Sequence, residues 1–218
     1  MDTLAGERSH VLVRQVKEWG NILLGVDARN RFEILGEGGE VIGQAAEEGT
    51  GLGATVLRNV FGRCRVATVH LYDRSGRVCG RGAKPFRWYF HRLDVYADER
   101  LLGTIERRFA PPHRKFVILD AAGAETGSIS SSWFRIWTFR VTHLGREVGF
   151  IRKRWRGLLQ ETFTDADVFG VEFTDPRLPP ELRTLVLLGT FLVDITCFDR
   201  QSMAGLTDAV DWVTDFWT

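Results

Sequence analysis

Hydrophobic and polar residues alternate along much of this chain, in short runs separated by turn sequences. Five segments follow one scheme, in which a β-branched or aromatic run and a turn lead into a second run with a glycine near its third position. They are RFEILGEGGEVIGQAA, ATVHLYDRSGRVCGRG, RLDVYADERLLGTIER, KFVILDAAGAETGSIS and FRVTHLGREVGFIRKR. Turn residues between two alternating runs predict β-hairpins.

The glycines of these segments recur at a fixed spacing. In four segments a turn glycine is followed four residues later by a strand glycine: Gly39 and Gly43, Gly76 and Gly80, Gly123 and Gly127, and Gly145 and Gly149. Gly103 takes the second role after ADER in the remaining segment. A glycine inside a strand indicates a bend, a bulge or a close approach by another backbone.

The segments KPFRWYFH, SWFRIWTF and DVFGVEF contribute further predicted strands, which brings the total to about ten to twelve. So many consecutive antiparallel strands close into a barrel or pack as a sandwich, because closure removes exposed strand edges. A barrel of this size has a wide interior that must be filled.

The most hydrophobic stretch, from Leu182 to Phe198, predicts a helix that either crosses a membrane or fills the barrel. As a helix it is roughly 26 Å long, slightly short of the ~30 Å hydrocarbon core of a bilayer. Asp194 lies inside it, where a carboxylate in a bilayer costs about 2.5 to 3.5 kcal/mol. We therefore expect the helix, from Glu181 to Phe198, to fill the barrel, with Gly189 allowing close contact and Asp194 either hydrogen-bonded or at the barrel mouth.

Composition and charge exclude several classes of protein. With 44% hydrophobic and 26% charged residues and a net charge of +1, the chain has the balance of a soluble globular protein. The polar N-terminus indicates no secretory signal, so we expect a cytoplasmic location, and the three cysteines fit buried thiols. GEGGEVIG continues as a strand, where a dinucleotide-binding loop needs a helix, and no HExxH, GxSxG or Walker sequence occurs, so we predict no covalent catalysis.

The C-terminal half carries a resemblance to a known family. VGFIRKRWRGLLQETFTDADVFGVEF, followed by TLVLLGTFLVDITCFD, resembles the C-terminal signature of the phospholipid scramblases. The match includes Gly149, Trp155, the FTDAD of residues 163–167 and Asp194, and earlier hairpins extend it over about residues 10 to 199.

The resemblance implies a mainly β, tubby-like fold shared with the LURP-one-related proteins: a closed antiparallel barrel of twelve strands around a central hydrophobic helix. We expect this barrel to occupy residues 1–199 and an amphipathic tail helix to occupy 200–218. Eukaryotic members also carry a Pro-rich N-terminal region and a palmitoylated cysteine cluster. This sequence has neither, with Cys64 alone at the corresponding place, so we do not expect an acyl anchor.

The resemblance further suggests an EF-hand-like calcium segment at DADVFGVEFTDP. Asp165 and Asp167 would supply the first ligands, and Asp175 is the one carboxylate near the end of the loop. The alternative is a turn at TDAD leading into a strand whose Phe169, Val171 and Phe173 face one way.

The densest basic cluster is RKRWR, which comprises Arg152, Lys153, Arg154, Trp155 and Arg156. In a strand the three arginines share one face, about 7 Å apart, while Lys153 and Trp155 share the other. Such a row suits lipid phosphates or another polyanion, and Trp155 suits the headgroup interface. The alternative is a solvated strand face balanced by Glu147 and Glu161.

A second basic patch surrounds the Pro-Pro turn of ERRFAPPHRKF. It comprises Arg107, Arg108, Arg114 and Lys115.

The tail SMAGLTDAVDWVTDFWT predicts an amphipathic helix. Its apolar stripe consists of Met203, Leu206, Val210, Val213 and Trp217. Aspartates beside the stripe would be repelled by an anionic bilayer, so we expect self-association or docking on the barrel, with simple core packing as the alternative.

The sequence thus supports two functional hypotheses. The first is a scramblase-like phospholipid-interacting protein that binds or moves lipids at the cytoplasmic membrane face, peripherally, with anionic lipid favoured. The second is a non-enzymatic scaffold or regulator whose barrel binds protein or, through the same arginines, nucleic acid.

Overall fold

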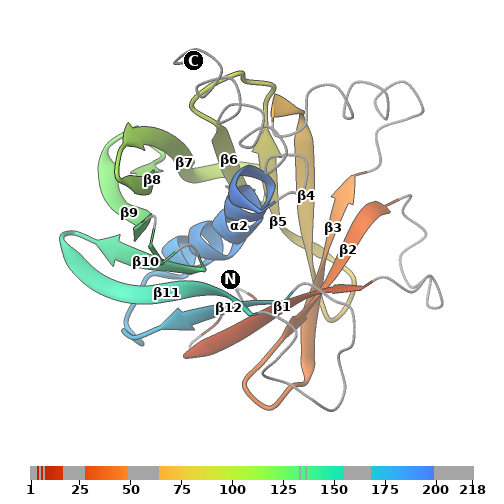
Figure 1. The fold of residues 1–218 in the computed structure, drawn as a ribbon. Coiled ribbons are helices and arrows are strands. Elements are labelled where there is room, and N and C mark those ends of the chain that lie inside the picture. Colours follow the sequence, from red (N-terminus) through yellow and green to blue (C-terminus); the bar gives the residue numbers. More distant parts are fainter. Residues whose placement is uncertain are drawn as a thin grey trace, which may run out of the picture.

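The computed structural model describes residues 4, 6, 8–16, 28–48, 64–132, 134–135, 137–154 and 168–198. Within these ranges the chain forms twelve strands followed by one helix, labelled α2 in Figure 1. The strands are β1 (His10–Val16), β2 (Ala28–Leu35), β3 (Val41–Glu48), β4 (Ala67–Asp73), β5 (Val78–Lys84), β6 (Arg92–Ala97), β7 (Arg100–Ala110), β8 (His113–Asp120), β9 (Glu125–Ser132), β10 (Thr138–His143), β11 (Arg146–Arg154) and β12 (Val168–Phe173), and α2 spans Pro180–Cys197.

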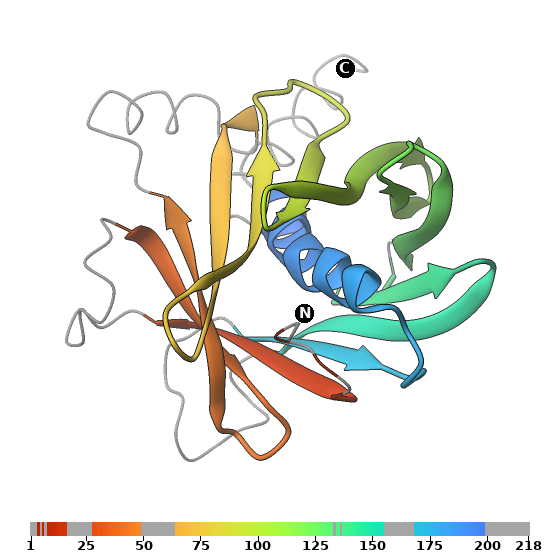
Figure 2. The ribbon, with the colours of Figure 1, turned by 180° about the vertical axis from the view of Figure 1, so that it is seen from behind.

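The strands form a closed antiparallel barrel in which each strand pairs with its neighbours in the chain, and β1 pairs with β12 to complete the ring. Seen from both sides in Figures 1 and 2, α2 passes through the middle of this ring. The predicted fold class, a mainly β closed barrel of about twelve strands around a C-terminal hydrophobic helix, is confirmed.

All five predicted hairpins are present, and each contains a bulge beside its strand glycine. The ladder between β10 and β11, for example, shifts register directly after the pair Val141 and Gly149. The same shift follows Gly43, Gly80, Gly103 and Gly127 in the other hairpins. A bulge bends its strand and increases its twist, so its repetition helps the sheet to curve into a barrel.

At four of the five strand glycines, the backbone of the next strand leaves no space for a Cβ atom. A Cβ at Gly149 would lie 2.1 Å from the carbonyl oxygen of Glu172 in β12. A Cβ at Gly43, Gly103 or Gly127 would lie 2.2–2.5 Å from a backbone oxygen of the following strand. Gly80 is the exception, because its nearest neighbour would be the Leu71 side chain at 3.3 Å.

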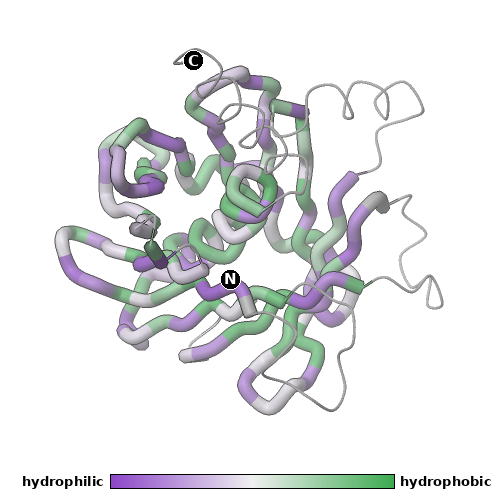
Figure 3. Tube along the Cα trace, viewed as in Figure 1, coloured by the Kyte–Doolittle hydropathy of each residue, from purple (hydrophilic) through white to green (hydrophobic). Residues whose placement is uncertain are grey.

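The helix α2 is buried along almost its whole length. Figure 3 shows it as a largely hydrophobic element inside strands that alternate between hydrophobic and hydrophilic residues. A Cβ at Gly189 would come within 2.7 Å of Ile105 Cδ1 and 3.1 Å of Ile129 Cδ1, so the wall approaches the helix closely there, as predicted. The described residues contain no helix with the length and hydrophobicity needed to cross a bilayer.

Polar side chains inside the barrel bond to nearby backbone carbonyls. Thr184, Thr190 and Thr196 each donate a hydroxyl hydrogen bond to the carbonyl four residues earlier in α2. Arg183, only 1% exposed, donates to the carbonyls of Arg8, Asp175, Pro176 and Leu178 and lies over the Phe173 ring. These bonds offset the cost of burying polar groups beside an apolar core.

One predicted strand is wrong and another is correct only at its ends. Residues 85–91 of KPFRWYFH form a loop between β5 and β6. In SWFRIWTF, Ser132 ends β9 and Thr138 and Phe139 begin β10, but Phe134 and Arg135 belong to the connection between these strands. Both segments have aromatic residues typical of strands, but Pro85 lacks a backbone N–H for a ladder, and tertiary position overrides the local propensity. The strand β1 was not identified from the sequence, since no turn signal pairs it with a neighbour in the chain.

Candidate functional site

The two ends of the barrel differ in their connections. The short turns within the five hairpins and the loop from β12 to α2 lie at one end, which we call the turn end. The described connections between hairpins, including residues 85–91 and 134–135, lie at the other end, which we call the loop end. Because α2 starts directly after β12, its C-terminal end also lies at the loop end.

The described part of the predicted basic row lies at the loop end of β11. Arg152 points outward, and its guanidinium pairs with Glu172 of β12 and lies 4.7 Å from the centre of the Phe150 ring. Glu147, expected to balance the row, instead pairs with Arg140 at 2.9 Å. The side chain of Arg154 and the whole of Trp155, Arg156 and Glu161 lie outside the described residues.

Lys153 lies on the face of β11 opposite Arg152, as strand alternation predicted, and that face is the barrel interior. Its Nζ lies 3.3 Å from Asp194 Oδ1 of α2 and 4.9 and 4.8 Å from the ring centres of Phe169 and Phe198. The side chain is 8% exposed, so Lys153 does not share the outer surface with Arg152. Asp194 is thus ion-paired at the barrel mouth, which confirms the expectation that its carboxylate would be satisfied.

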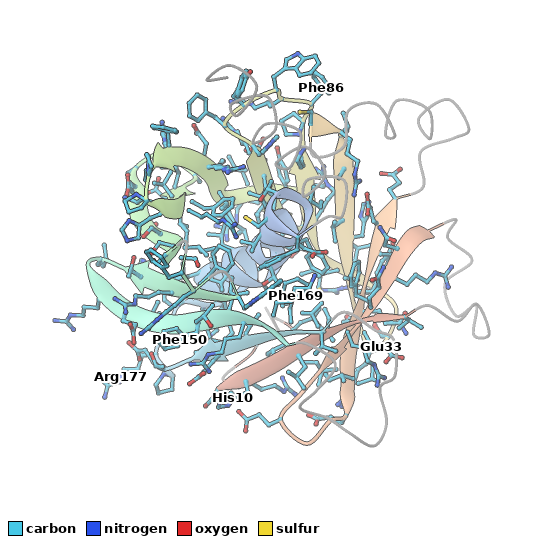
Figure 4. The ribbon with its side chains drawn as sticks, in the orientation of Figure 1. His10, Glu33, Phe86, Phe150, Phe169 and Arg177 are labelled. Carbon is cyan, nitrogen blue, oxygen red and sulfur yellow. The ribbon has the colours of Figure 1, made fainter. Side chains whose placement is uncertain are left out.

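An aromatic cluster closes the interior around the Lys153–Asp194 pair. The Trp137 and Phe198 rings are stacked with centroids 5.1 Å apart, and Phe139 and Phe169 lie 6.0 and 5.9 Å from Phe198. Figure 4 shows Phe169 close to α2 and Phe86 at the outer edge of the molecule. The cluster and the ion pair together fix the end of the helix to the wall of the barrel.

The second basic patch lies at the loop end of β7 and β8, next to the cis peptide bond between Pro111 and Pro112. Arg108 lies opposite Lys115 in the ladder, and these two residues also pair with Glu106 at 3.5 Å and Glu125 at 3.6 Å. Burial raises the pKa of the Cys197 thiol at the end of α2, while Arg114 and Arg107 act in the opposite direction. Both basic clusters therefore lie at the end of the barrel where α2 terminates.

A buried charged network at the same end was not predicted. The Lys84 ammonium donates to the Arg65 carbonyl at 2.6 Å, Arg65 pairs with Glu47, and Asn30 donates to Glu47 at 2.6 Å. Lys84 is only 1% exposed, and this desolvation, with the nearby Arg65 charge, lowers its pKa from 10.5 to about 8. In the sequence Lys84 ends an alternating strand pattern that gives no sign of a buried charge. Its burial becomes evident only in the closed barrel.

The described part of the suggested calcium segment is a strand. Phe169, Val171 and Phe173 of β12 are all buried on one side, as the alternative to the calcium loop required. Asp175 accepts the Arg177 backbone N–H at 2.9 Å and shapes the turn after β12. Asp165 and Asp167 lie outside the described residues, and no group of three or more metal-ligating side chains occurs within the described ranges.

The predicted tail stripe also lies outside the described residues. It comprises Met203, Leu206, Val210, Val213 and Trp217.

Sequence similarity to known proteins extends over most of the chain. The scramblase family model matches residues 2–200. The chain is 29% identical to phospholipid scramblase 2 of Homo sapiens over 87% of this chain and 67% of that protein. It is 26% identical to human phospholipid scramblase 1 over 87% of this chain and 63% of that protein. A phospholipid scramblase family protein of Schizosaccharomyces pombe is 24% identical over 75% of this chain and 46% of its own length. No solved structure matches significantly.

Proposed function

The chain belongs to the scramblase family, and from this premise we propose that it interacts with phospholipids peripherally, at the cytoplasmic face of a membrane. The observation that supports this most directly is the basic loop end of the barrel. It combines Arg152 on β11 with the basic patch on β7 and β8. Guanidinium groups bind phosphate with two parallel hydrogen bonds, so this end suits phospholipid headgroups.

The proposed mode of action is contact with lipid on the outer surface of the barrel. The interior is occupied by α2, whose residues pack against the inward faces of the strands. Lys153 and the aromatic cluster add contacts between the wall and the helix end. We therefore propose no route for lipid through the middle of the barrel, and the protein acts on the position of lipids rather than on their covalent bonds.

Vesicle flotation tests this proposal. The wild-type chain should float with vesicles of equimolar phosphatidylcholine and phosphatidylserine. Substituting the predicted row by glutamine, in the triple variant Arg152→Gln, Arg154→Gln and Arg156→Gln, should abolish this binding because three phosphate contacts are lost. A matched control removes three exposed arginines from the turn end: Arg77→Gln, Arg146→Gln and Arg177→Gln.

The outcome separates two questions. If the wild-type chain does not bind these vesicles, the proposed function fails. If it binds and both triple variants bind equally well, lipid interaction stands but the row at the end of β11 is not its site.

Calcium binding at Asp165 and Asp167 is part of the proposal, but without Asp175, because the extended strand β12 places Asp175 at the opposite end of the barrel. Repeating the flotation with calcium or with a chelator tests it, and we expect a difference only if these carboxylates hold the ion.

A further inference from the structure

We propose that three exposed loops at the loop end form an interfacial anchor that inserts aromatic rings into the headgroup region of a phospholipid membrane. This inference rests on the proposed function and specifies which surface meets the lipid. The anchor consists of residues 85–91, the tip of the β7–β8 hairpin from Phe109 to His113, and Phe134 with Arg135.

The apolar side chains of these loops are unusually exposed. Phe134 is 94% exposed, Phe109 82% and Tyr89 80%, and Phe90 and Trp88 are at least half exposed. Single exposed apolar side chains are common on proteins, but several aromatic rings at one end of a barrel indicate an interaction surface. Trp and Tyr are favoured at the membrane–water interface, where they have both apolar and polar surroundings, and Phe gains from burying its apolar ring there.

The three loops are neighbours around the rim of the barrel. The Arg107 backbone N–H donates to the His91 carbonyl at 2.8 Å, which joins β7 to the first loop. On the other side His113 pairs with Ser132 in the β8–β9 ladder, and Ser131 donates its hydroxyl to the Arg135 carbonyl at 2.6 Å. The rings are therefore carried by one continuous part of the rim, from β5 to β10.

The positive charge of these loops favours an anionic phospholipid surface as the partner. Residues 84–92, 107–115 and 134–135 contain no Asp or Glu but carry Arg87, Arg108, Arg114, Lys115 and Arg135 among their basic residues. Lys115 and Arg108 are ion-paired with Glu125 and Glu106, so the positive charge of this rim rests mainly on Arg87, Arg114 and Arg135. Basic residues near an anionic surface attract it, while the aromatic rings gain from leaving water.

The turn end is net acidic. The segments between its strands carry Glu37, Glu40, Asp98, Glu99 and Asp175, which an anionic membrane repels, against the three arginines Arg74, Arg77 and Arg177. This polarity along the barrel axis orients the molecule, with the loop end toward the membrane and the turn end toward water.

A triple substitution of the most exposed rings tests the anchor. Tyr89→Ser, Phe109→Ser and Phe134→Ser together should weaken partitioning to equimolar phosphatidylcholine and phosphatidylserine vesicles by at least about tenfold, because each ring loses apolar burial. The matched control changes exposed apolar residues of the turn end, with Val41→Ser, Val78→Ser and Leu144→Ser, and should bind like the wild type.

The outcomes separate the anchor from the proposed function. If the wild-type chain binds and the aromatic triple variant binds as well as the control, the anchor is overturned while lipid interaction stands. If the wild-type chain does not bind, the proposed function fails and the anchor with it. Thermal unfolding of each variant checks the fold, and Phe134→Ser alone repeats the test should the triple variant fail to fold.

Discussion

The repeated strand glycine makes a quantitative prediction at Gly149. In the variant Gly149→Ala the new Cβ would lie 2.1 Å from the carbonyl oxygen of Glu172, more than 1 Å inside ordinary contact. That oxygen belongs to the backbone of β12, which is held by pairing with β11 on one side and β1 on the other. The wall cannot relax by rotating a side chain, so the strands must separate.

We expect this substitution to lower the free energy of unfolding by about 3 kcal/mol or more. Overpacking alone costs about 1 to 3 kcal/mol, and each backbone hydrogen bond lost from the β11–β12 ladder adds about 1 kcal/mol. Urea denaturation, followed by circular dichroism, measures the change.

Gly80→Ala is the matched control, because Gly80 occupies the same place in its own hairpin, beside the same type of bulge. Its Cβ would meet only the ends of the Leu71 and Thr184 side chains, at 3.3 and 3.6 Å. We expect the free energy of unfolding to change by no more than about 1 kcal/mol. The alanine reduces the conformational entropy of the unfolded chain, which offsets part of any loss in packing. Equal destabilisation by the two substitutions would refute the argument that backbone approach requires the glycine.

Three further predictions concern the ion pair, the buried lysine and the tail. Lys153→Met should lower the free energy of unfolding by about 2 kcal/mol, because the partly buried Asp194 carboxylate loses this partner. In a double-mutant cycle, adding Asp194→Asn should recover part of that loss. Lys84 is deprotonated more easily in the folded chain than in the unfolded one, so its contribution to stability should rise with pH between about 8 and 10.5, by about 3 kcal/mol in full. Denaturation of wild type and Lys84→Met over this pH range measures that contribution as a difference. Deletion of residues 200–218 should lower the apparent mass in light scattering if the tail mediates self-association.

Each of these predictions has a contradicting result. Additive single-substitution effects in the cycle would show that Lys153 and Asp194 do not act as a pair. A stability difference between wild type and Lys84→Met that stays constant with pH would contradict the lowered pKa. If the number of chains per particle is unchanged after deletion, the tail does not mediate self-association and packs within one chain.

Local patterns sufficed for the hairpins but not for their surroundings. The spacing of turn and strand glycines identified four hairpins, and ADER with Gly103 identified the fifth, because these residues serve local geometry, such as the positive φ of Gly145 in its turn. The aromatic composition of KPFRWYFH predicts a strand where the structure has a loop at residues 85–91, because composition does not reveal whether a neighbouring strand is in reach. The strand β1 was not predicted because one of its two partners, β12, lies at the far end of the sequence, and the other, β2, begins only at Ala28.

The candidate site shows the same division. Strand alternation correctly separated Lys153 from Arg152, yet it could not identify Asp194 as the partner of Lys153, since that contact joins residues 41 positions apart. Arg183 interrupted a hydrophobic stretch without an evident role. Its acceptors include the carbonyl of Arg8, 175 residues earlier, which only the closed barrel brings within reach.

The order of elements along the chain has a consequence for synthesis in the cell. All twelve described strands leave the ribosome before α2, the segment on which their inner faces pack. The ring of strands can close only after β12 has been synthesised, because β12 pairs with β1. This pairing joins the two strands that are farthest apart in the sequence, so it closes the longest loop in the sheet. A nascent chain that stops before Pro180 has all twelve described strands but lacks α2, so the apolar inner faces of the strands stay accessible to chaperones and proteases. Completion of the last helix therefore acts as a check on synthesis, because truncated copies cannot hide their core.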